Sequence, residues 1–371
     1  MLTKSDNHLL KGIAILSIML HNLLHLLPGA VAENEFTFSA RNIQRVLFEF
    51  HHSQEVWRMI ASVFSHFGHY GVPIFLFLSG YGLVMKYEKS PVQAPSTLLF
   101  LWQHMKKLWG LMIPGFVVVL FFLIDWHTFT LSFGKSNPWL TLAFLGNFFE
   151  FDTLIYGPWW FFSLMLQFYV LYRCVFYQWR SAILLWIIVG LSLLAMWFAY
   201  ESNIHLEISD SSLLRYFRVS ALGHLLPFAI GISAARWGGA ATMKKWNNKL
   251  SPILQQGLVL LTSLLGLVLL YCSAFHFTFW LFSPLFAIMA VVPWTSLLRH
   301  PSLRMGWEHW GTYSSALFVY HPIIRAEILP RAAQAVARND VATLGWSIVL
   351  FITLAYILAR ARCRGQSTVC Q

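Results

Sequence analysis

The sequence predicts an all-α polytopic integral membrane protein with about ten transmembrane helices. Of its 371 residues, 57% are hydrophobic and only 11% are charged, whereas a soluble globular chain carries roughly 25% charged residues. So few charges cannot cover the surface of a soluble protein of this size. The mean hydropathy is +0.60, and several apolar stretches reach the length of about 20 residues that a helix needs to cross a bilayer.

Ten apolar stretches are predicted to span the membrane, and because they and their short connections use up the chain, we expect a single transmembrane domain over residues 1–371. A further stretch at 140–150 is too short to cross and is predicted to be re-entrant or interfacial. The long connection 29–68 is predicted to end in an interfacial helix. The ten predicted spans are 8–28, 69–87, 108–125, 159–179, 182–200, 213–235, 252–272, 279–297, 312–330 and 344–360.

Basic residues in the loops predict the orientation, because lysine and arginine accumulate on the cytoplasmic side of membrane proteins. With ten spans, a cytoplasmic N-terminus places most loop lysines and arginines inside and most acidic residues outside. We therefore expect both termini in the cytoplasm. The net charge of +11 comes from charges scattered in ones and twos between apolar runs. This pattern suits lipid headgroups and loop orientation better than the continuous phosphate contacts of a nucleic-acid-binding protein.

Other features of the chain exclude two further classes. The four cysteines form no CxxC pair, so neither a disulfide framework nor a zinc site is predicted. The first apolar stretch is preceded by lysines and followed by a sequence that resembles a signal-peptidase site. However, it carries His21, Asn22 and His25, which a signal peptide does not need. We therefore expect this stretch to remain as the first membrane helix.

The first predicted span places several polar groups inside the membrane, where such groups are costly and usually functional. Lys11 lies near its inner end, and His21 lies about 15 Å further along the helix axis. At 100° per residue, Asn22 falls within about 20° of Lys11, His25 about 40° away and His21 about 80° away. These groups therefore share one broad polar face, and we expect them to line one tunnel. The alternatives to a tunnel are that the histidines only form hydrogen bonds across helices, or that the i, i+4 pair of histidines holds a metal. Because this span offers no carboxylate or cysteine, no metal is predicted.

The second span contains SGYG, with Ser79, Gly80 and Tyr81. Small residues in mid-helix most often allow two helices to pack closely, although glycine also lets a ligand approach the backbone. Lys106 and Lys107 follow in a cytoplasmic stretch. They are either ordinary loop charges or contacts for phosphate groups.

Later spans add further polar and aromatic candidates. Trp160 opens the fourth span, where tryptophan is ordinarily an interfacial anchor. Tyr320 and His321 precede a proline in the ninth span, and such a pair can mark no more than a kink. Arg215, near the outer end of the sixth span, either binds a polar acceptor or extends its head toward the interface.

Taken together, these segments resemble the membrane-bound acyltransferase-3 family, which O-acylates cell-surface sugars. Each segment is short and apolar, but their order and spacing extend from the first to the ninth span. The resemblance therefore covers nearly the whole chain. The segments are KGIAILSIMLHNLLH (11–25), VPIFLFLSGYGL (72–83), Trp160 with QFY (167–169), and SALFVYHPI (315–323).

The resemblance implies transfer of an acyl group, usually acetyl, from cytoplasmic acyl-CoA to a hydroxyl of an extracytoplasmic or lipid-linked glycan. It also implies a place in the bacterial inner membrane and acyl-CoA as a co-substrate rather than a permanently bound cofactor. A first-helix histidine, His21 or His25, would be the general base, since histidine titrates near neutrality. Acyl-CoA would contact Lys11, Ser79, Gly80, Tyr81, Lys106 and Lys107. The acceptor cavity would involve Asn22, Trp160, Arg215, Tyr320 and His321.

The first helix departs from the commonest family pattern, which is an arginine and a histidine separated by ten residues. Here the basic residue is Lys11, His21 follows after nine residues, and Asn22 occupies the usual histidine position. Related sequences that begin KGIAIL carry a histidine pair there, which favours His21, whereas the helical wheel favours His25. Both remain candidates for the base.

The fourth span departs as well, because many family members carry a glutamate where this chain has Met165 and Leu166. If that carboxylate orients the base in other members, a different group must do so here. Family members with an added soluble esterase-like domain hand the acyl group on, and we expect no such domain here.

Two other functions fit ten helices with buried polar groups, namely a transporter or flippase of a lipid-linked sugar, and a glycan polymerase. Neither requires the lysine and histidine face of the first helix. The sequence does not identify the acceptor glycan.

Overall fold

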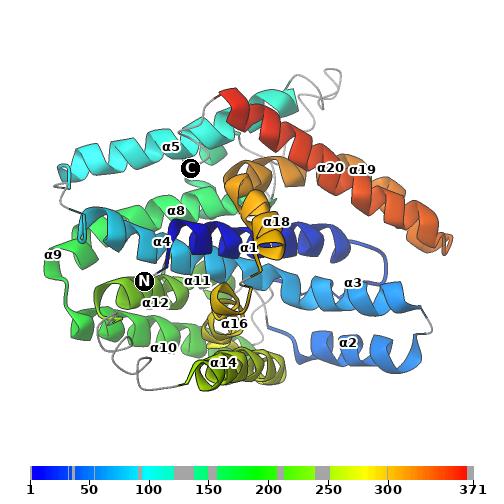
Figure 1. The fold of residues 1–371 in the computed structure, drawn as a ribbon, viewed down its shortest axis with the longest axis horizontal. Coiled ribbons are helices and arrows are strands. Elements are labelled where there is room, and N and C mark those ends of the chain that lie inside the picture. The colour runs from blue at the N-terminus through cyan, green and yellow to red at the C-terminus, as the bar shows by residue number, and fades with distance from the viewer. Residues whose placement is uncertain are drawn as a thin grey trace.

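Helices form all the regular secondary structure in the part of the chain that the computed structural model describes (Figure 1). That part comprises residues 2–31, 33–35, 38–53, 55–90, 94–120, 138–148, 157–206, 213–238, 251–298 and 300–365. The predicted all-α class is confirmed. The first half contains α1 (Lys4–Leu24), α2 (Ala40–His52), α3 (Val56–Phe67), η1 (Gly68–Tyr70), α4 (Gly71–Tyr87), α5 (Thr97–Val118), α7 (Pro138–Leu142), η3 (Gly146–Phe148), η5 (Gly157–Trp159), α8 (Trp160–Leu171), η6 (Tyr172–Phe176) and α9 (Tyr177–Trp179).

The described residues of the second half also form helices. They are α10 (Ala182–Leu206), α11 (Leu213–Arg218), α12 (Leu225–Arg236), α14 (Pro252–Ser273), α15 (Phe277–Trp280), α16 (Ser283–Val291), α17 (Trp294–Leu297), α18 (Pro301–Thr312), α19 (Ser314–Ala337) and α20 (Val341–Gly365). Most of the predicted spans correspond to one helical segment each. The predicted spans 213–235 and 279–297 are instead broken, the first into α11 and α12 and the second into α15, α16 and α17.

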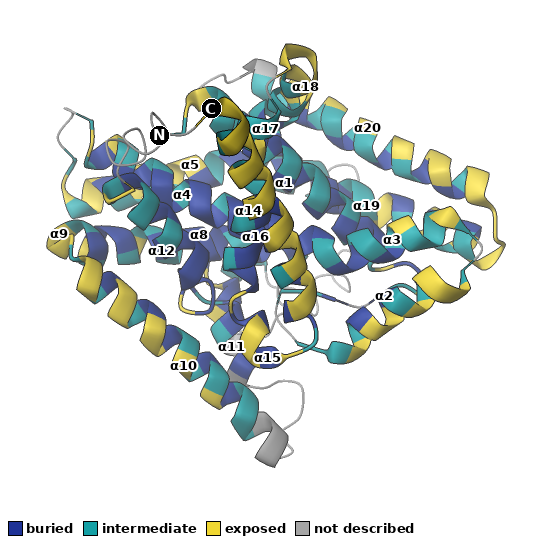
Figure 2. Cartoon of the chain, turned by 60° about the horizontal axis from the view of Figure 1, so that its bottom comes forward, coloured by how far each residue is buried: buried dark blue, intermediate teal, exposed yellow. Residues whose placement is uncertain are grey.

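Five helical segments in the described ranges are long and apolar enough to cross a membrane: Val56–Tyr87, Gly157–Trp179, Ala182–Ser202, Pro252–Ser273 and Val341–Cys363. In three of them the apolar side chains face outward. Only 28% of the most apolar stretch of α10, 17% of that of α14 and 22% of that of α20 is buried, and Figure 2 shows the exposed bands along these helices. Apolar surface of this extent is stable against lipid rather than water. The chain is a multi-pass membrane protein, and the number of ten spans stays a prediction.

The short segment predicted at 140–150 is described as far as residue 148. There it forms two brief helical turns, α7 and η3, separated by Phe144 with φ at 59°. A left-handed backbone at a residue with a side chain ends a helix, and neither turn is long enough to cross a bilayer.

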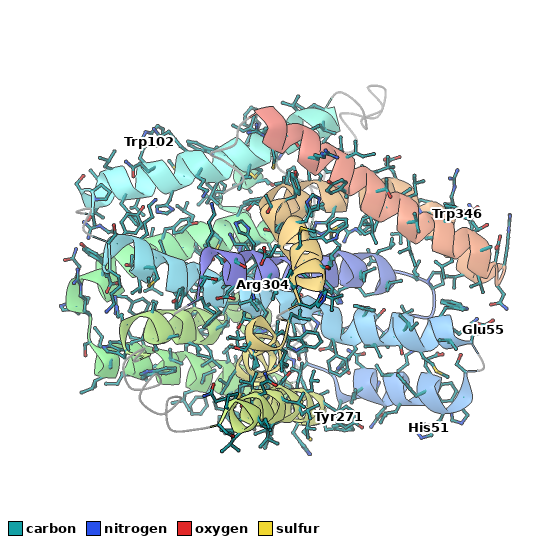
Figure 3. All side chains as sticks on the ribbon, in the orientation of Figure 1. His51, Glu55, Trp102, Tyr271, Arg304 and Trp346 are labelled. Atoms are coloured by element: carbon teal, nitrogen blue, oxygen red, sulfur yellow. The ribbon has the colours of Figure 1, made fainter. Side chains whose placement is uncertain are left out.

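The centre of the fold is α1, with α4 beside it and α18 crossing it (Figure 1). Thr3 and Asp6 form a capping box at the start of α1. Glycine allows the crossing, since a Cβ on Gly12 would lie 1.9 Å from the main-chain oxygen of Trp307. At the crossing, Arg304 of α18 lies 2.5 Å from the Asp6 carboxylate (Figure 3). These contacts fix the end of α1 that carries Lys11.

Candidate active site

A cavity of about 330 Å³ lies at the C-terminal half of α1. Its walls come from α1, the segment between α1 and α2, the junction of η1 and α4, the start of α8 and the middle of α19. The polar members of the lining are His21, Asn22, His25, Asn34, Glu35, His69 and Arg325, and its aromatic members include Trp160 and Phe318. A concave site with several convergent polar groups is the usual form of a ligand site.

The histidine pair of α1, His21 and His25, belongs to this lining. His21 Nδ1 is 3.3 Å from the main-chain oxygen of Phe64, and His25 Nδ1 is 2.7 Å from that of His21. The two rings are stacked, with centroids 4.5 Å apart and planes within 3°. A carbonyl oxygen only accepts, so in neutral histidine Nδ1 carries the proton and Nε2 keeps its lone pair. Both histidines are thus arranged as proton acceptors.

Close packing of α1 against η1 determines where His21 lies. A Cβ on Gly68 would lie 2.7 Å from both the Cβ of His21 and the main-chain oxygen of Ser17. Only glycine allows the two backbones to approach this closely. The ring of His69, in η1, then lies 5.2 Å from the ring of His21, so a third histidine reaches the cavity from a different element.

Asn22 is held by a network that connects α1 with α19. Its Nδ2 is 3.0 Å from the main-chain oxygen of Ile18 and 3.2 Å from Nε2 of His321, and its Oδ1 accepts from Arg325 at 3.3 Å. His321 in turn has Nδ1 3.0 Å from the oxygen of Leu317. His321 is completely buried behind Asn22. It positions the amide rather than lining the cavity.

The other residues predicted for the acceptor cavity differ in whether they line it. Trp160 lines it. Tyr320 is buried in α19 and is not among the lining residues. Arg215 belongs to α11, but its side chain lies outside the described part of the structure. Arg325, which was not predicted from the sequence, brings an arginine to the cavity.

A carboxylate reaches the cavity from Glu35, which follows α1. From the sequence, Glu35 is only one of the acidic residues expected outside the membrane. Arg218 Nε donates to its main-chain oxygen at 2.6 Å, and Trp160 hydrogen-bonds its side chain. Burial raises the pKa of the Glu35 carboxyl to about 7, against the lowering effects of hydrogen bonds and of Arg218. Met165 and Leu166, which stand where the resemblance places a glutamate, are respectively buried in the hydrophobic core and partly buried against it.

Glu33 is a buried acid that does not belong to the cavity lining. The carboxylate of Glu33 accepts from Asn42 Nδ2 at 2.5 Å and lies 3.7 Å from Nδ1 of His66. Glu33 and His66 are each 2% exposed. Burial raises the pKa of Glu33 to about 8, although the hydrogen bond from Asn42 opposes this shift. Among the described residues no three acidic, histidine or cysteine side chains are arranged to hold a metal ion.

Positive charge collects at the opposite end of α1. Lys11 lies close enough to Lys107 of α5 for their charges to repel, and Lys86 of α4 has the same effect on Lys107. Lys106 is not among the charges that act on Lys11 or Lys107, and its ammonium lies 5.5 Å from the ring of Trp102. Lys86 therefore joins the predicted group and Lys106 lies apart from it.

The SGYG segment of α4 contacts neighbouring helices in this structure. A Cβ on Gly80 would lie 2.3 Å from the main-chain oxygen of Phe228, so Gly80 allows α12 to pack against α4. The hydroxyl of Ser79 donates to the oxygen of Phe75 at 2.7 Å, and the Tyr81 hydroxyl accepts from the N–H of Leu2 at 2.9 Å. None of the three predicted residues lines the cavity.

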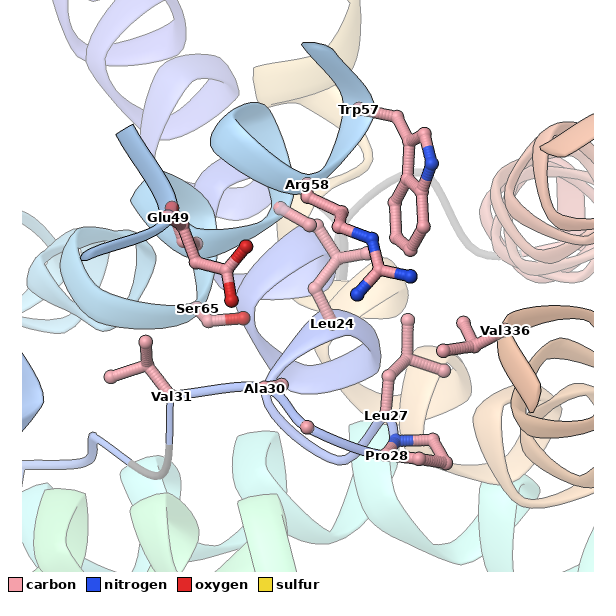
Figure 4. A pocket seen from close by; sticks show the side chains of 13 residues that line it. Leu24, Leu27, Pro28, Ala30, Val31, Glu49, Trp57, Arg58, Ser65 and Val336 are labelled. Atoms are coloured by element: carbon pink, nitrogen blue, oxygen red, sulfur yellow. The ribbon is translucent and has the colours of Figure 1, made fainter. Parts of the chain in front are cut away.

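A smaller hollow of about 40 Å³ lies beside the end of α1, between α2, α3 and α19 (Figure 4). Leu24, Leu27 and Trp57 make its walls largely apolar, and Glu49 and Arg58 lie at its edge. This volume admits a few water molecules. The cavity at the histidines is therefore the better candidate for a substrate site.

Comparison with known proteins agrees with the resemblance drawn from the sequence. The model of a family described as an acyltransferase domain matches residues 7–360. No curated protein and no solved structure matches the chain. The family match covers every residue of the histidine cavity and the lysine group named above. The chain belongs to the acyltransferase-3 family.

Proposed function

We propose that this protein is a membrane-bound O-acyltransferase of the bacterial cytoplasmic membrane. It transfers an acyl group, acetyl by preference, from cytoplasmic acyl-CoA to a hydroxyl of an extracytoplasmic or lipid-linked glycan. The observation that carries the proposal is the histidine pair of α1. Both histidines line the cavity, and each has its Nδ1 bonded to a main-chain oxygen, which leaves Nε2 as the proton acceptor.

This geometry supports the following reaction. The acceptor hydroxyl oxygen attacks the thioester carbonyl while its proton moves to histidine Nε2. The C–S bond then breaks, and the thiolate takes the proton back from the imidazolium. The products are an ester and the free thiol of CoA. Arg325 brings a permanent positive charge to the cavity, and such a charge favours the oxyanion that develops on the carbonyl.

The donor would approach from the end of α1 that carries Lys11, Lys86 and Lys107. Lysines bind phosphate groups as point charges, and the diphosphate and ribose phosphate of CoA need such partners. Lys11 is ten residues before His21, or about 15 Å along the helix. The flexible pantetheine arm would extend along α1 from the lysines to the cavity.

The same polar groups could belong to a transporter of lipid-linked sugars, and thiol release separates the two functions. The purified protein in lipid nanodiscs would be given acetyl-CoA with and without a glycan acceptor, and CoA thiol would be measured with a thiol-reactive dye. An acyltransferase releases thiol in proportion to the ester formed on the acceptor. A transporter releases none.

The proposed orientation places both termini in the cytoplasm and residues 126–158 outside. Most of this segment lies outside the described residues. Single cysteines in place of Lys135 and Asp152 should react with a membrane-impermeant maleimide from the extracytoplasmic side. Labelling of the Asp152 position from the cytoplasm alone would contradict the ten-span arrangement.

A further inference from the structure

Glu35 is the one carboxylate among the described residues that line the histidine cavity. It lies in the connection between α1 and α2, whereas the other polar lining groups come mostly from helices. The lining otherwise offers ring nitrogens, amides and the guanidinium of Arg325. A carboxylate in such a setting accepts hydrogen bonds and donates none, so its natural ligands are donor groups.

The Glu35 carboxylate is fixed in place from two sides. Arg218 holds the main chain through Nε at 2.6 Å from the Glu35 oxygen. Arg218 is itself fixed, since its Nη1 donates to the main-chain oxygen of Gly223 at 2.8 Å and its guanidinium lies 4.5 Å from the ring of Trp280. On the cavity side, Trp160 hydrogen-bonds the carboxylate. A preformed group of this kind loses little entropy when it binds a ligand.

The carboxylate does not orient the candidate bases. Nδ1 of His21 is directed to the oxygen of Phe64, and Nδ1 of His25 to that of His21. Main-chain oxygens therefore perform the orienting role that a carboxylate performs in many histidine sites. Glu35 shares the cavity with the bases but remains available for the substrate.

We propose that Glu35 binds a hydroxyl of the acceptor adjacent to the hydroxyl that is acylated, so that the enzyme selects acceptors with neighbouring hydroxyl groups. This assignment rests on the acyl transfer proposed above. Trp160 beside Glu35 provides an aromatic wall next to the polar group. The positive charges of Arg218 and Arg325 near the cavity disfavour a protonated amine as the partner of Glu35. The partner of Glu35 is therefore a neutral hydroxyl of the acceptor and not an amine.

The test uses the full-length protein in nanodiscs at pH 8, with acetyl-CoA and a set of methyl pyranosides as acceptors. For the best acceptor, each monodeoxy derivative is compared with the parent by kcat/KM. A site built to bind a hydroxyl through a charged group rejects the analogue that lacks it. The wild type should lose about 10- to 100-fold in kcat/KM when the adjacent hydroxyl is removed. Glu35→Gln should lose less than about 3-fold on the same change.

Glu49→Gln is the matched control, because Glu49 lies in α2 outside the cavity lining. It should distinguish the parent acceptor from the deoxy acceptor as strongly as the wild type does.

If Glu35→Gln does not fold, Trp160→Phe is measured instead. This variant removes the indole N–H that holds the carboxylate, and it should also weaken the discrimination between the two acceptors. If Glu35→Gln, or Trp160→Phe where it is used, rejects the deoxy acceptor as strongly as the wild type does, the inference is overturned while the proposed acyl transfer is unaffected. A Glu35→Gln variant that binds acetyl-CoA normally but acylates neither compound also overturns it. If the wild type acylates no glycoside, the proposed function fails and the inference fails with it.

Discussion

Replacing Gly68 with alanine tests how the packing of α1 against η1 places His21. The added Cβ would lie 2.7 Å from His21 Cβ and from the Ser17 oxygen. Ordinary contact begins at 3.4 Å, so the two elements must separate by 3.4 − 2.7, or about 0.7 Å. Overpacking of this kind typically destabilises a protein by about 1–3 kcal/mol. A displacement approaching 1 Å in a catalytic group lowers turnover by about 10²-fold.

The assay measures kcat and KM for acetyl transfer together with the thermal midpoint in nanodiscs. We expect kcat to fall by about 10- to 100-fold and the KM for acetyl-CoA to change little, because the lysines lie at the other end of α1. Gly190→Ala in α10 is the control, since a Cβ there would meet no atom within 4 Å. Wild-type kcat in Gly68→Ala, with an unchanged midpoint, would refute the close approach and the placement of His21 that depends on it.

Three further predictions concern the donor site, a buried acid and the network behind the cavity. Alanine at Lys11 and Lys107 should raise the apparent KM for acetyl-CoA by at least 10-fold with little effect on the acceptor, and an unchanged KM would remove them from the donor site. Burial raises the pKa of Glu33 to about 8, so between about pH 5 and pH 8 the folded state binds a proton that the unfolded state has released. The free energy of unfolding should therefore fall as the pH rises through this range, by at most about 1.4 kcal/mol per pH unit. Glu33→Gln should flatten this dependence, and an equal slope in both proteins would contradict it. His321→Phe should remove one of the hydrogen-bond partners of the Asn22 amide and lower kcat by about 10-fold. His321→Gln should restore part of the loss, and wild-type kcat in the phenylalanine variant would exclude the positioning role.

The sequence predicted the class of the fold and three residues of the cavity lining because both depend on local patterns. Apolar runs identify membrane helices by length alone. The helical wheel placed His21, Asn22 and His25 on one broad face of α1, and these three residues do line one cavity. The breaks inside the predicted spans 213–235 and 279–297 were not predicted, because hydropathy averaged along a stretch does not register where the backbone turns.

The remaining cavity residues could not be predicted, since tertiary contacts place them. Glu35 is positioned by Arg218, which is 183 residues away in the chain. His69 reaches the cavity because Gly68 lets η1 pack against α1. Arg325 lies one helical turn beyond His321 and meets Asn22 only when α19 packs beside α1. A sequence signal for Glu35 did exist, in the two acids that flank Asn34 directly after the first span. These two acids showed that the segment is polar, but not which of its side chains enters the cavity.

The most direct test of the account is acyl-transfer turnover in His21→Gln and His25→Gln, measured as ester formation and CoA thiol release by purified, folded protein. Glutamine keeps a hydrogen-bonding amide but cannot take up a proton near pH 7. Positioned general-base catalysis contributes about 10²- to 10⁴-fold. We expect His21→Gln to lose that much in kcat with acetyl-CoA binding unchanged. If His25→Gln alone loses activity, the base is one turn further along α1 and the mechanism is unchanged. Wild-type turnover in both variants would contradict base catalysis from α1.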